Sequence, residues 1–199
     1  DTLFRIRVDR PAEYQFLAGE FTMIGMGDDD TLRAYSYACG PDDPYLEFYS
    51  IKVPNGPLTS RLQHVQPGDE IEVWNKPTGS LILNNLEPGG NLWLLATGTG
   101  IAPFISLLKD PQTYENYDQV HVVWSVRYPS EILSYNDFLQ ECDANYFPTV
   151  TREEFVNVGR IQSHIEQGNI FKNATPETDR VMLCGSMEFN KDIKQMLVH

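Results

Sequence analysis

The sequence is poor in cysteine and has no metal-binding motif built on it. Its three cysteines, Cys39, Cys142 and Cys184, lie far apart, and no Cys-x-x-Cys pair occurs. This spacing argues against a disulfide framework, a zinc site or an iron–sulfur cluster held by this chain alone. It is typical of reduced thiols in the cytoplasm, so we expect a cytoplasmic protein without a bound metal.

Long apolar runs and basic residues are also scarce. No stretch is apolar enough to cross a bilayer, and residues 1–5 have neither the basic start nor the apolar core of a signal peptide, so we expect no membrane insertion. Lys and Arg total 15 against 28 Asp and Glu, for a net charge of −13. This balance weighs against nucleic acid or an anionic membrane as a partner. An arginine at a functional position therefore stands out.

The first half, up to about residue 87, has the pattern of antiparallel β-structure. Apolar and polar side chains alternate in four segments separated by Gly, Pro, Asn and Asp: residues 3–8, 21–24, 46–53 and 70–74. One short helix fits near residues 58–64. Several short strands at this spacing predict a small all-β barrel.

After a Pro- and Gly-rich linker at residues 87–91 the pattern changes. Continuous apolar runs now alternate with helical periodicity, at residues 92–96, 120–124 and 181–184, with a shorter strand near 148–150. Helices are predicted around Ile105, over 135–142 and 161–167, and from Phe189 onward. Strands that alternate with helices predict a parallel sheet with right-handed crossovers over residues 91–199.

A glycine-rich turn, Gly98-Thr99-Gly100, joins the first of these strands to its helix. Glycine lets backbone approach a pyrophosphate closely, and the N–H groups at a helix start suit an anion. The turn is not the GxGxxG fingerprint, so a tight turn without a ligand stays an alternative.

Arginines follow the predicted parallel strands. Arg127 comes directly after the second strand, Arg152 after the third, and Arg160 opens the next helix. Ligands of open parallel sheets bind outside the carboxyl ends of the strands, where arginine accommodates the 2′-phosphate of NADP. We therefore predict NADP(H) rather than NAD(H), with solvated surface charges as the alternative.

Ordered motifs along nearly the whole chain resemble the ferredoxin–NADP⁺ reductase family. They are Arg33-Ala34-Tyr35-Ser36, the segment Gly98–Pro103 and Cys184-Gly185, and residues 46–49 and 53–59 resemble its bacterial branch in particular. The resemblance implies a six-stranded antiparallel FAD-binding barrel of the Greek-key type over residues 1–87. An α/β NADP(H)-binding domain would follow over residues 91–199.

The resemblance also implies roles for single residues. Arg33 would pair with the FAD pyrophosphate, Tyr35 would lie against the flavin ring, and Ser36 would lie near flavin N5. Further flavin contacts would come from Tyr49, Ile51, Val53, Gly56, Leu58, Thr59 and Thr99. The NADP site would comprise Gly98, Gly100, Arg127, Arg152, Arg160 and Gly185. Ser36, Thr99 and Cys184 would shape the hydride transfer itself.

The implied activity is electron transfer between NADP(H) and ferredoxin or flavodoxin, through hydride transfer at N5 of FAD, by a monomer. The resemblance leads us to expect that a first barrel strand and a C-terminal tail are absent. Two alternatives stay open: a reductase module that serves an oxygenase or free flavin, and an electron-transfer subunit that works only in a complex. The dihydroorotate dehydrogenase subunit is similar, but its cysteine cluster is lacking here.

Overall fold

The computed structural model describes residues 3–198. Its contacts divide the chain into two compact units. The first unit comprises the residues up to Asn85 together with Ala102–Asp110, and the second comprises Leu86–Ile101 together with the residues from Pro111 onward.

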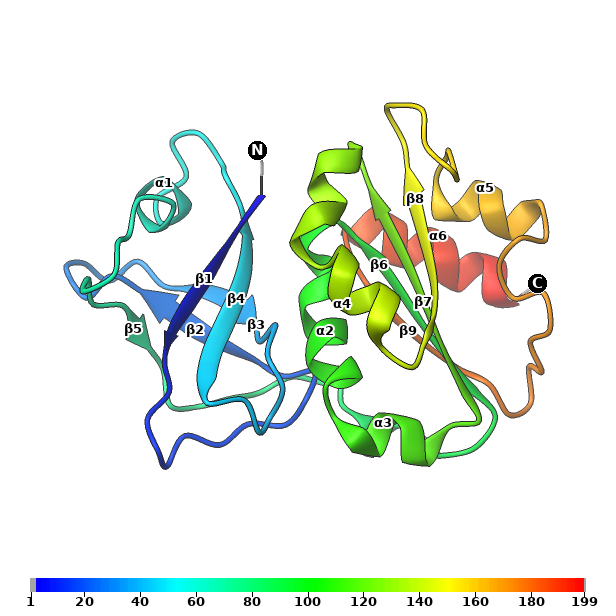
Figure 1. The fold of residues 1–199 in the computed structure, drawn as a ribbon, viewed down its shortest axis with the longest axis horizontal. Coiled ribbons are helices and arrows are strands. Elements are labelled where there is room, and N and C mark those ends of the chain that lie inside the picture. The colour runs from blue at the N-terminus through cyan, green and yellow to red at the C-terminus, as the bar shows by residue number, and fades with distance from the viewer. Residues whose placement is uncertain (1–2, 199) are drawn as a thin grey trace. The chain divides into compact units, whose positions relative to one another are not determined.

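The first unit is built on two small antiparallel sheets (Figure 1). Its strands are β1 (Leu3–Asp9), β2 (Phe21–Gly25), β3 (Arg33–Ser36), β4 (Tyr45–Ile51) and β5 (Glu72–Val73). Strand β1 pairs with β4, and β2 lies between β3 and β5. A bridge between Tyr37 and Phe48 joins the continuation of β3 to β4 and so links the two sheets. The barrel-type prediction is confirmed.

Aromatic side chains fill the interior of this unit. Tyr37 is fully buried, stacks on Phe16 with ring centroids 4.0 Å apart, and shares a 2.6 Å hydrogen bond between its hydroxyl and that of Tyr14. Helix α1 (Thr59–Leu62) adds the buried Leu62 to this core. The predicted helix at residues 58–64 is therefore present but shorter.

The second unit contains a four-stranded parallel sheet in the order β8-β7-β6-β9. Its strands are β6 (Asn91–Thr97), β7 (Gln119–Val126), β8 (Asn145–Val150) and β9 (Arg180–Cys184). Helix α4 (Asn136–Glu141) lies on one side of the sheet, and α5 (Ile161–Glu166) and α6 (Met187–Val198) lie on the other (Figure 1). The predicted parallel sheet is confirmed.

Smaller helical segments complete the chain. They are the 3-10 turns η1 (Leu83–Asn85), η2 (Gly98–Ile101) and η3 (Pro129–Ser134), and the helices α2 (Ala102–Leu108) and α3 (Pro111–Asn116). Strand β8 begins at Asn145, earlier than the sequence pattern predicts, because it pairs with β7 from His121 onward. The pattern also does not predict α3, which is a short helix that begins at a proline.

The second unit is held at the start of its strands by one carboxylate. Asp179 accepts hydrogen bonds from the backbone N–H groups of Asn91 (3.0 Å) and Thr175 (3.1 Å) and from the Trp93 indole (2.9 Å). Burial alone would raise the pKa of Asp179, but these donors outweigh it, and the pKa lies below its ordinary value. The contacts join the starts of β6 and β9.

The described part of the chain has neither a membrane-spanning helix nor a cluster of metal ligands. Among residues 3–198, no helix is long and apolar enough to cross a membrane. No group of three or more His, Cys, Asp or Glu side chains in the same range could hold a metal ion.

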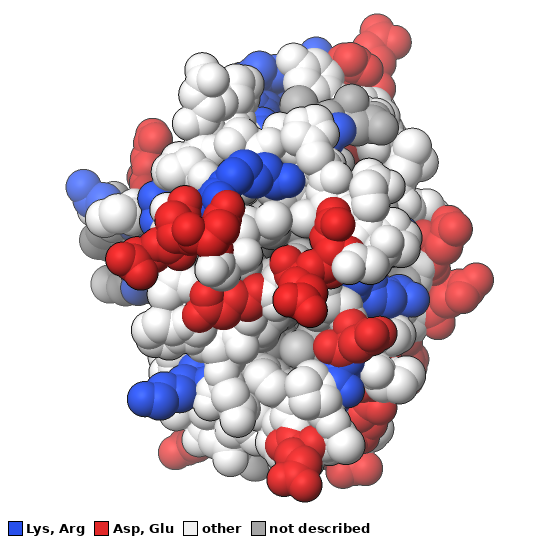
Figure 2. Space-filling view, turned by 90° about the vertical axis from the view of Figure 1, so that its left-hand side faces the viewer, with Lys and Arg blue, Asp and Glu red and all other residues white. Residues whose placement is uncertain are grey.

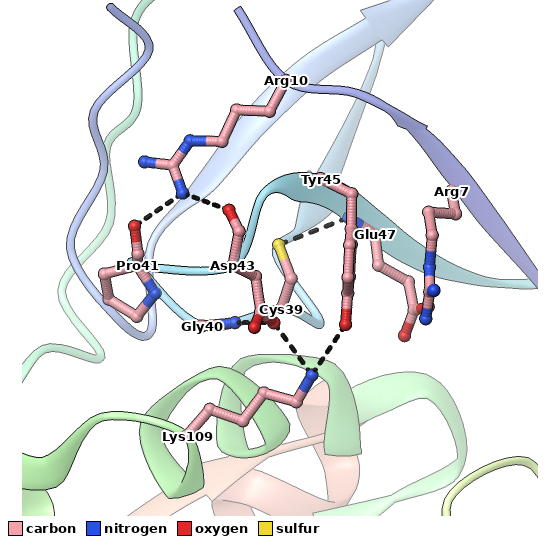
Figure 3. A network of polar contacts seen from close by, with 9 residues as sticks. All are labelled: Arg7, Arg10, Cys39, Gly40, Pro41, Asp43, Tyr45, Glu47 and Lys109. Atoms are coloured by element: carbon pink, nitrogen blue, oxygen red, sulfur yellow. Dashed lines mark hydrogen bonds and ion pairs between the residues drawn. The ribbon is translucent and has the colours of Figure 1, made fainter. Parts of the chain in front are cut away.

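A polar network attaches the end of α2 to the turn between β3 and β4 (Figure 3). The Lys109 ammonium donates to the Asp43 carboxylate (2.9 Å) and to the Tyr45 hydroxyl (3.2 Å). The Gly40 N–H donates to the same Asp43 oxygen (2.8 Å). Burial opposes the charge on Asp43, but the bonds from Lys109 and Gly40 outweigh it and lower its pKa.

This pair predicts a measurable contribution to stability. Lys109→Met keeps most of the side-chain volume but leaves the Asp43 carboxylate half-buried without its cation, so we expect a loss of about 1–2 kcal/mol. Because the pKa of Asp43 is lowered on folding, its contribution is complete above the unfolded value of about 3.9 and is lost as the pH falls through the folded value.

Urea titration of both proteins from neutral to acid pH measures the effect. Lys76→Met, at an exposed lysine of the same unit, is the matched control and should change little. Equal stability of the Lys109 variant and the wild type at neutral pH would contradict the prediction.

Candidate functional site

In the first unit, the residues predicted to bind flavin lie on β3, β4 and the turn that follows β4. Tyr35 of β3 is half-buried, and its hydroxyl lies 3.0 Å from the Ser50 hydroxyl of β4. Its ring also packs edge-on against Phe48, and burial raises the pKa of Tyr35. These contacts bring the Arg33–Ser36 motif next to β4.

Tyr49 and Ile51 are two residues apart in β4, and Val53 lies two residues beyond the end of this strand. Residues two apart in a strand lie on one face, so Tyr49 and Ile51 share a side of β4. Tyr49 is only 3% exposed, whereas Val53 is 42% exposed, at the start of the turn. The predicted flavin-contacting series therefore runs from the interior of the unit to its surface.

The turn after β4 is tight and polar. Asn55 has a φ of 61°, and the Gly56 N–H donates to the Val53 carbonyl (3.0 Å). A Cβ atom at Gly56 would lie 2.4 Å from Oγ1 of Thr59, so the turn has no space for a larger residue. Oγ1 of Thr59 is itself buried, yet it has no hydrogen-bond partner among residues 3–198. A buried hydroxyl without a partner fits a site whose polar ligand lies outside the chain.

Arg61 was not predicted from the sequence as part of this site. Its guanidinium pairs with Asp28 (2.6 Å) and Asp29 (2.9 Å), and so joins α1 to the loop between β2 and β3. Arg33 follows that loop, is exposed, and donates to the Leu32 carbonyl (2.7 Å). The aspartates of this loop therefore pair with Arg61. Arg33 forms no ion pair within residues 3–198.

In the second unit, the strand order identifies the ligand-binding edge. From β6 the chain moves to β7 and β8 on one side and returns to β9 on the other. Such a reversal marks the place where open parallel sheets bind ligands, outside the carboxyl ends of the strands. Gly98–Ile101 follows β6, and Gly185 follows β9, at this reversal. The structure thus brings together two motifs that are distant in the sequence.

The two motifs touch through their backbones. A Cβ atom at Gly100 would lie 2.1 Å from the Cys184 carbonyl oxygen, and one at Gly185 would lie 2.2 Å from Oγ1 of Thr97. Gly98 has a φ of 54° and nothing within 4 Å of its absent side chain. Gly100 and Gly185 are therefore required by packing, whereas Gly98 leaves open space beside the turn.

Two further side chains define the chemistry of this edge. The fully buried Trp124, not predicted from the sequence, donates its indole N–H to the Gly98 carbonyl (2.8 Å) and so fixes the turn. Burial raises the pKa of the Cys184 thiol to about 11, which keeps it protonated at neutral pH. A protonated thiol is a poor nucleophile, so Cys184 suits a shaping role rather than a covalent one. Thr99 lies half-buried within the turn.

The predicted arginines follow the neighbouring strands β7 and β8. The Arg152 N–H donates to the Arg127 carbonyl (3.0 Å), which places the two residues side by side. Arg160 follows Gly159, whose N–H donates to the Val150 carbonyl at the end of β8 (2.9 Å). The structure therefore gathers Arg127 and Arg152 and places the Arg160 segment beside the end of β8.

Sequence reasoning missed two residues of this edge. The Tyr128 hydroxyl accepts a 3.4 Å hydrogen bond from Arg152, whose guanidinium also lies over the Tyr128 ring. The Glu131 carboxylate is buried and accepts the N–H groups of Arg127 (2.8 Å) and Tyr128 (3.1 Å). An acidic residue shortly after Pro129 is a typical signal for capping such a turn and could have identified Glu131.

The chain matches known proteins over nearly its whole length. A family model for the oxidoreductase NAD-binding domain matches residues 94–195. The flavodoxin/ferredoxin–NADP reductase of Rhodobacter capsulatus is 46% identical over 99% of this chain and 80% of its own length. The ferredoxin–NADP reductase of Pseudomonas aeruginosa is 43% identical over 99% of this chain and 84% of its own length.

Similarity in three dimensions agrees with this. A crystal structure of a ferredoxin NADP⁺ reductase from Neisseria gonorrhoeae with bound FAD and NADP has a TM-score of 0.93 and 31% identity. The match covers 99% of this chain and 85% of that one. Both units and the ordered motifs lie inside the matched region, and the chain therefore belongs to the ferredoxin–NADP⁺ reductase family.

Proposed function

We propose that this chain is a flavoprotein reductase that transfers electrons between NADP(H) and ferredoxin or flavodoxin through FAD. The observation that carries the proposal is the edge of the parallel sheet, where Gly98–Gly100 meets Cys184-Gly185 beside the Arg127–Arg152 pair. The relatives named above support the choice of carrier. We also propose a cytoplasmic monomer that binds no nucleic acid.

The first unit fits FAD through observations of its own. The Thr59 hydroxyl, which has no hydrogen-bond partner among residues 3–198, and the crowded Gly56 suit close approach of a polar group, and Arg33 is exposed at the start of β3. We propose that FAD is held by Arg33, Tyr35, Ser36, Tyr49, Ile51, Val53, Gly56, Leu58 and Thr59, within residues 1–87. Bound FAD would accept a hydride as an electron pair and release electrons one at a time.

The second unit fits NADP(H). The open space at Gly98 and the absence of side chains at Gly100 and Gly185 suit a pyrophosphate at the switch point. Arg127, Arg152 and Arg160 suit the 2′-phosphate, since guanidinium groups bind phosphate oxygens through paired hydrogen bonds. We assign this role to residues 91–199.

The transfer step needs orientation and protection of the reacting atoms more than acid–base chemistry. We propose that Ser36 offers its hydroxyl near flavin N5, and that Thr99 and the protonated Cys184 border the nicotinamide. These small polar side chains hold the reactants without attacking them. The roles rest on family resemblance and on the environment of each side chain in its own unit.

The distribution of charge on the surface bears on the choice of electron acceptor. Asp and Glu are widespread on the face shown in Figure 2, with Lys and Arg scattered among them. Arg7 pairs with Glu47 (2.9 Å), and Arg10 donates to the carbonyls of Pro41 (2.6 Å) and Asp43 (2.9 Å), so both support the fold (Figure 3). An oxygenase or free flavin as acceptor is therefore the second candidate, and assays with each acceptor separate it from the first.

The absorbance spectrum of the purified protein tests the cofactors together. We expect a flavin spectrum that bleaches under anaerobic conditions on addition of NADPH and only weakly with NADH. A colourless chain that takes up no FAD would contradict the proposal. A yellow chain without NADPH diaphorase activity would favour a subunit that works only in a complex.

Substitution of the arginines tests the 2′-phosphate site. Arg127→Ala and Arg152→Ala should each raise the KM for NADPH about 10- to 100-fold, because each removes a charge-assisted bond of about 1.5–3 kcal/mol. The KM for NADH should change little. Arg180→Ala is the matched control, because Arg180 pairs with Glu87 at the opposite end of β9. Equal losses for both nucleotides would overturn the assignment.

Substitution of Thr59 tests whether its hydroxyl contacts FAD or only supports the fold. Thr59→Val removes a hydroxyl that has no partner within the described chain, so we expect unchanged or higher stability of the FAD-free protein. The Kd for FAD should rise about 3- to 10-fold with the loss of one hydrogen bond. Ser60→Ala is the contrast, since the Ser60 hydroxyl donates to the Gly56 carbonyl (2.6 Å). An unchanged Kd for FAD in Thr59→Val would refute the contact.

A further inference from the structure

A buried polar pair lies behind the Arg160 segment and has no role in the function proposed above. Thr149 of β8 is 0% exposed and His164 of α5 is 5% exposed. Oγ1 of Thr149 lies 3.1 Å from Nε2 of His164. Buried polar side chains in folded proteins are nearly always hydrogen-bonded, and fully bonded networks hold their neighbours in place. The partners of this pair therefore indicate its role.

The hydrogen bonds fix where the protons lie. The Thr149 hydroxyl lies within donating distance of two carbonyls, that of Gly159 (2.7 Å) and, farther away, that of Asn157 (3.3 Å), and its single proton is used in this direction. Thr149 then accepts from Nε2–H of His164, while Nδ1 of His164 accepts from the Asn169 amide (3.2 Å). The neutral Nε2–H tautomer satisfies every one of these contacts.

The chain around Gly159 depends on this support. Gly159 has a φ of 126°, a conformation that side-chain-bearing residues rarely adopt, and its N–H donates to Val150 (2.9 Å). Its carbonyl belongs to the peptide that leads into Arg160. Thr149 holds this peptide from inside, and the first turn of α5 holds the peptide that follows Arg160, because the His164 backbone N–H donates to the Arg160 carbonyl (3.2 Å).

We propose that Thr149 and His164 are positioning residues that orient the Arg160 backbone and so contribute to the discrimination of NADPH from NADH. The inference rests on the proposed 2′-phosphate role of Arg160. Neither side chain needs to touch the nucleotide, because the effect passes through the peptide between Gly159 and Arg160. The Arg160 side chain is exposed, and no hydrogen bond or ion pair holds it within residues 3–198, so the position of its Cα is set by the backbone contacts described above.

Nucleotide fragments test the inference without relying on turnover. Calorimetry of the FAD-loaded protein would give the Kd of adenosine 2′,5′-bisphosphate and of 5′-AMP, which differ by the 2′-phosphate. Thr149→Val and His164→Leu should raise the first Kd about three- to tenfold and change the second little, which corresponds to one hydrogen bond. The NADPH KM should rise in parallel, with kcat retained.

Conservative variants distinguish positioning from packing. Thr149→Ser keeps the hydroxyl, and His164→Gln keeps a donor near the position of Nε2, so both should restore most of the discrimination. His121→Leu is the matched control: it removes another partly buried imidazole, stacked on Trp93 near the start of β7 at the other end of the sheet. If His164→Leu fails to fold, Thr149→Val carries the test.

Arg160→Ala separates the role of Arg160 itself from that of the Thr149–His164 pair. A changed ratio of the two Kd values in Arg160→Ala, together with an unchanged ratio in folded Thr149→Val, would overturn the positioning role and leave the proposed function standing. An unchanged ratio in Arg160→Ala itself would refute the 2′-phosphate role of Arg160 and the inference with it. Equal rises in both Kd values for Thr149→Val would show a general packing defect and also overturn the inference.

Discussion

The close approach of two backbone segments at the ends of β6 and β9 is the constraint on which the second unit depends. Parallel pairing sets Ala96 beside Cys184, so the turns that follow these strands must pass each other without side chains between them. Gly100 meets the Cys184 carbonyl, and Gly185 meets Thr97. The same lack of side chains that permits this packing leaves backbone at the surface where a nucleotide would bind. The packing requirement and the proposed binding role thus fall on the same residues.

Buried polar groups support the neighbouring arginine edge. The Glu131 carboxylate holds the backbone of Arg127, and Thr149 with His164 holds the peptide before Arg160. Arg160 is exposed and Arg127 is half-buried, and the backbone at or next to each is anchored by hydrogen bonds to buried side chains. Thr149 and His164 restrict the chain before Arg160 without a charge of their own, whereas the Glu131 carboxylate also lies 3.7 Å from the Arg127 guanidinium.

The first unit shows a different balance. Its acidic loop is compensated by Arg61, and Arg7 and Arg10 are engaged by Glu47 and by backbone carbonyls. Much of the small basic content of this chain therefore supports the fold. The feature of this unit that fits the proposed ligand site is instead the buried hydroxyl of Thr59, which has no hydrogen-bond partner among residues 3–198. Such an orphan group is a sharper indication of a ligand than composition, because it costs free energy until something bonds to it.

The sequence by itself determined the class of each half, since the period of apolar residues distinguishes half-buried strands from fully buried ones. It also predicted the glycine turn after the first parallel strand and the arginines after the next ones, because the ends of strands are visible in the local pattern of apolar residues. It could not show that Gly100 lies against Cys184, that Tyr128 joins Arg152, or that His164 supports the Arg160 segment. Those contacts follow from the strand order β8-β7-β6-β9, which only tertiary structure decided. Local pattern specifies elements, whereas the neighbours of an element depend on packing between residues far apart in the chain.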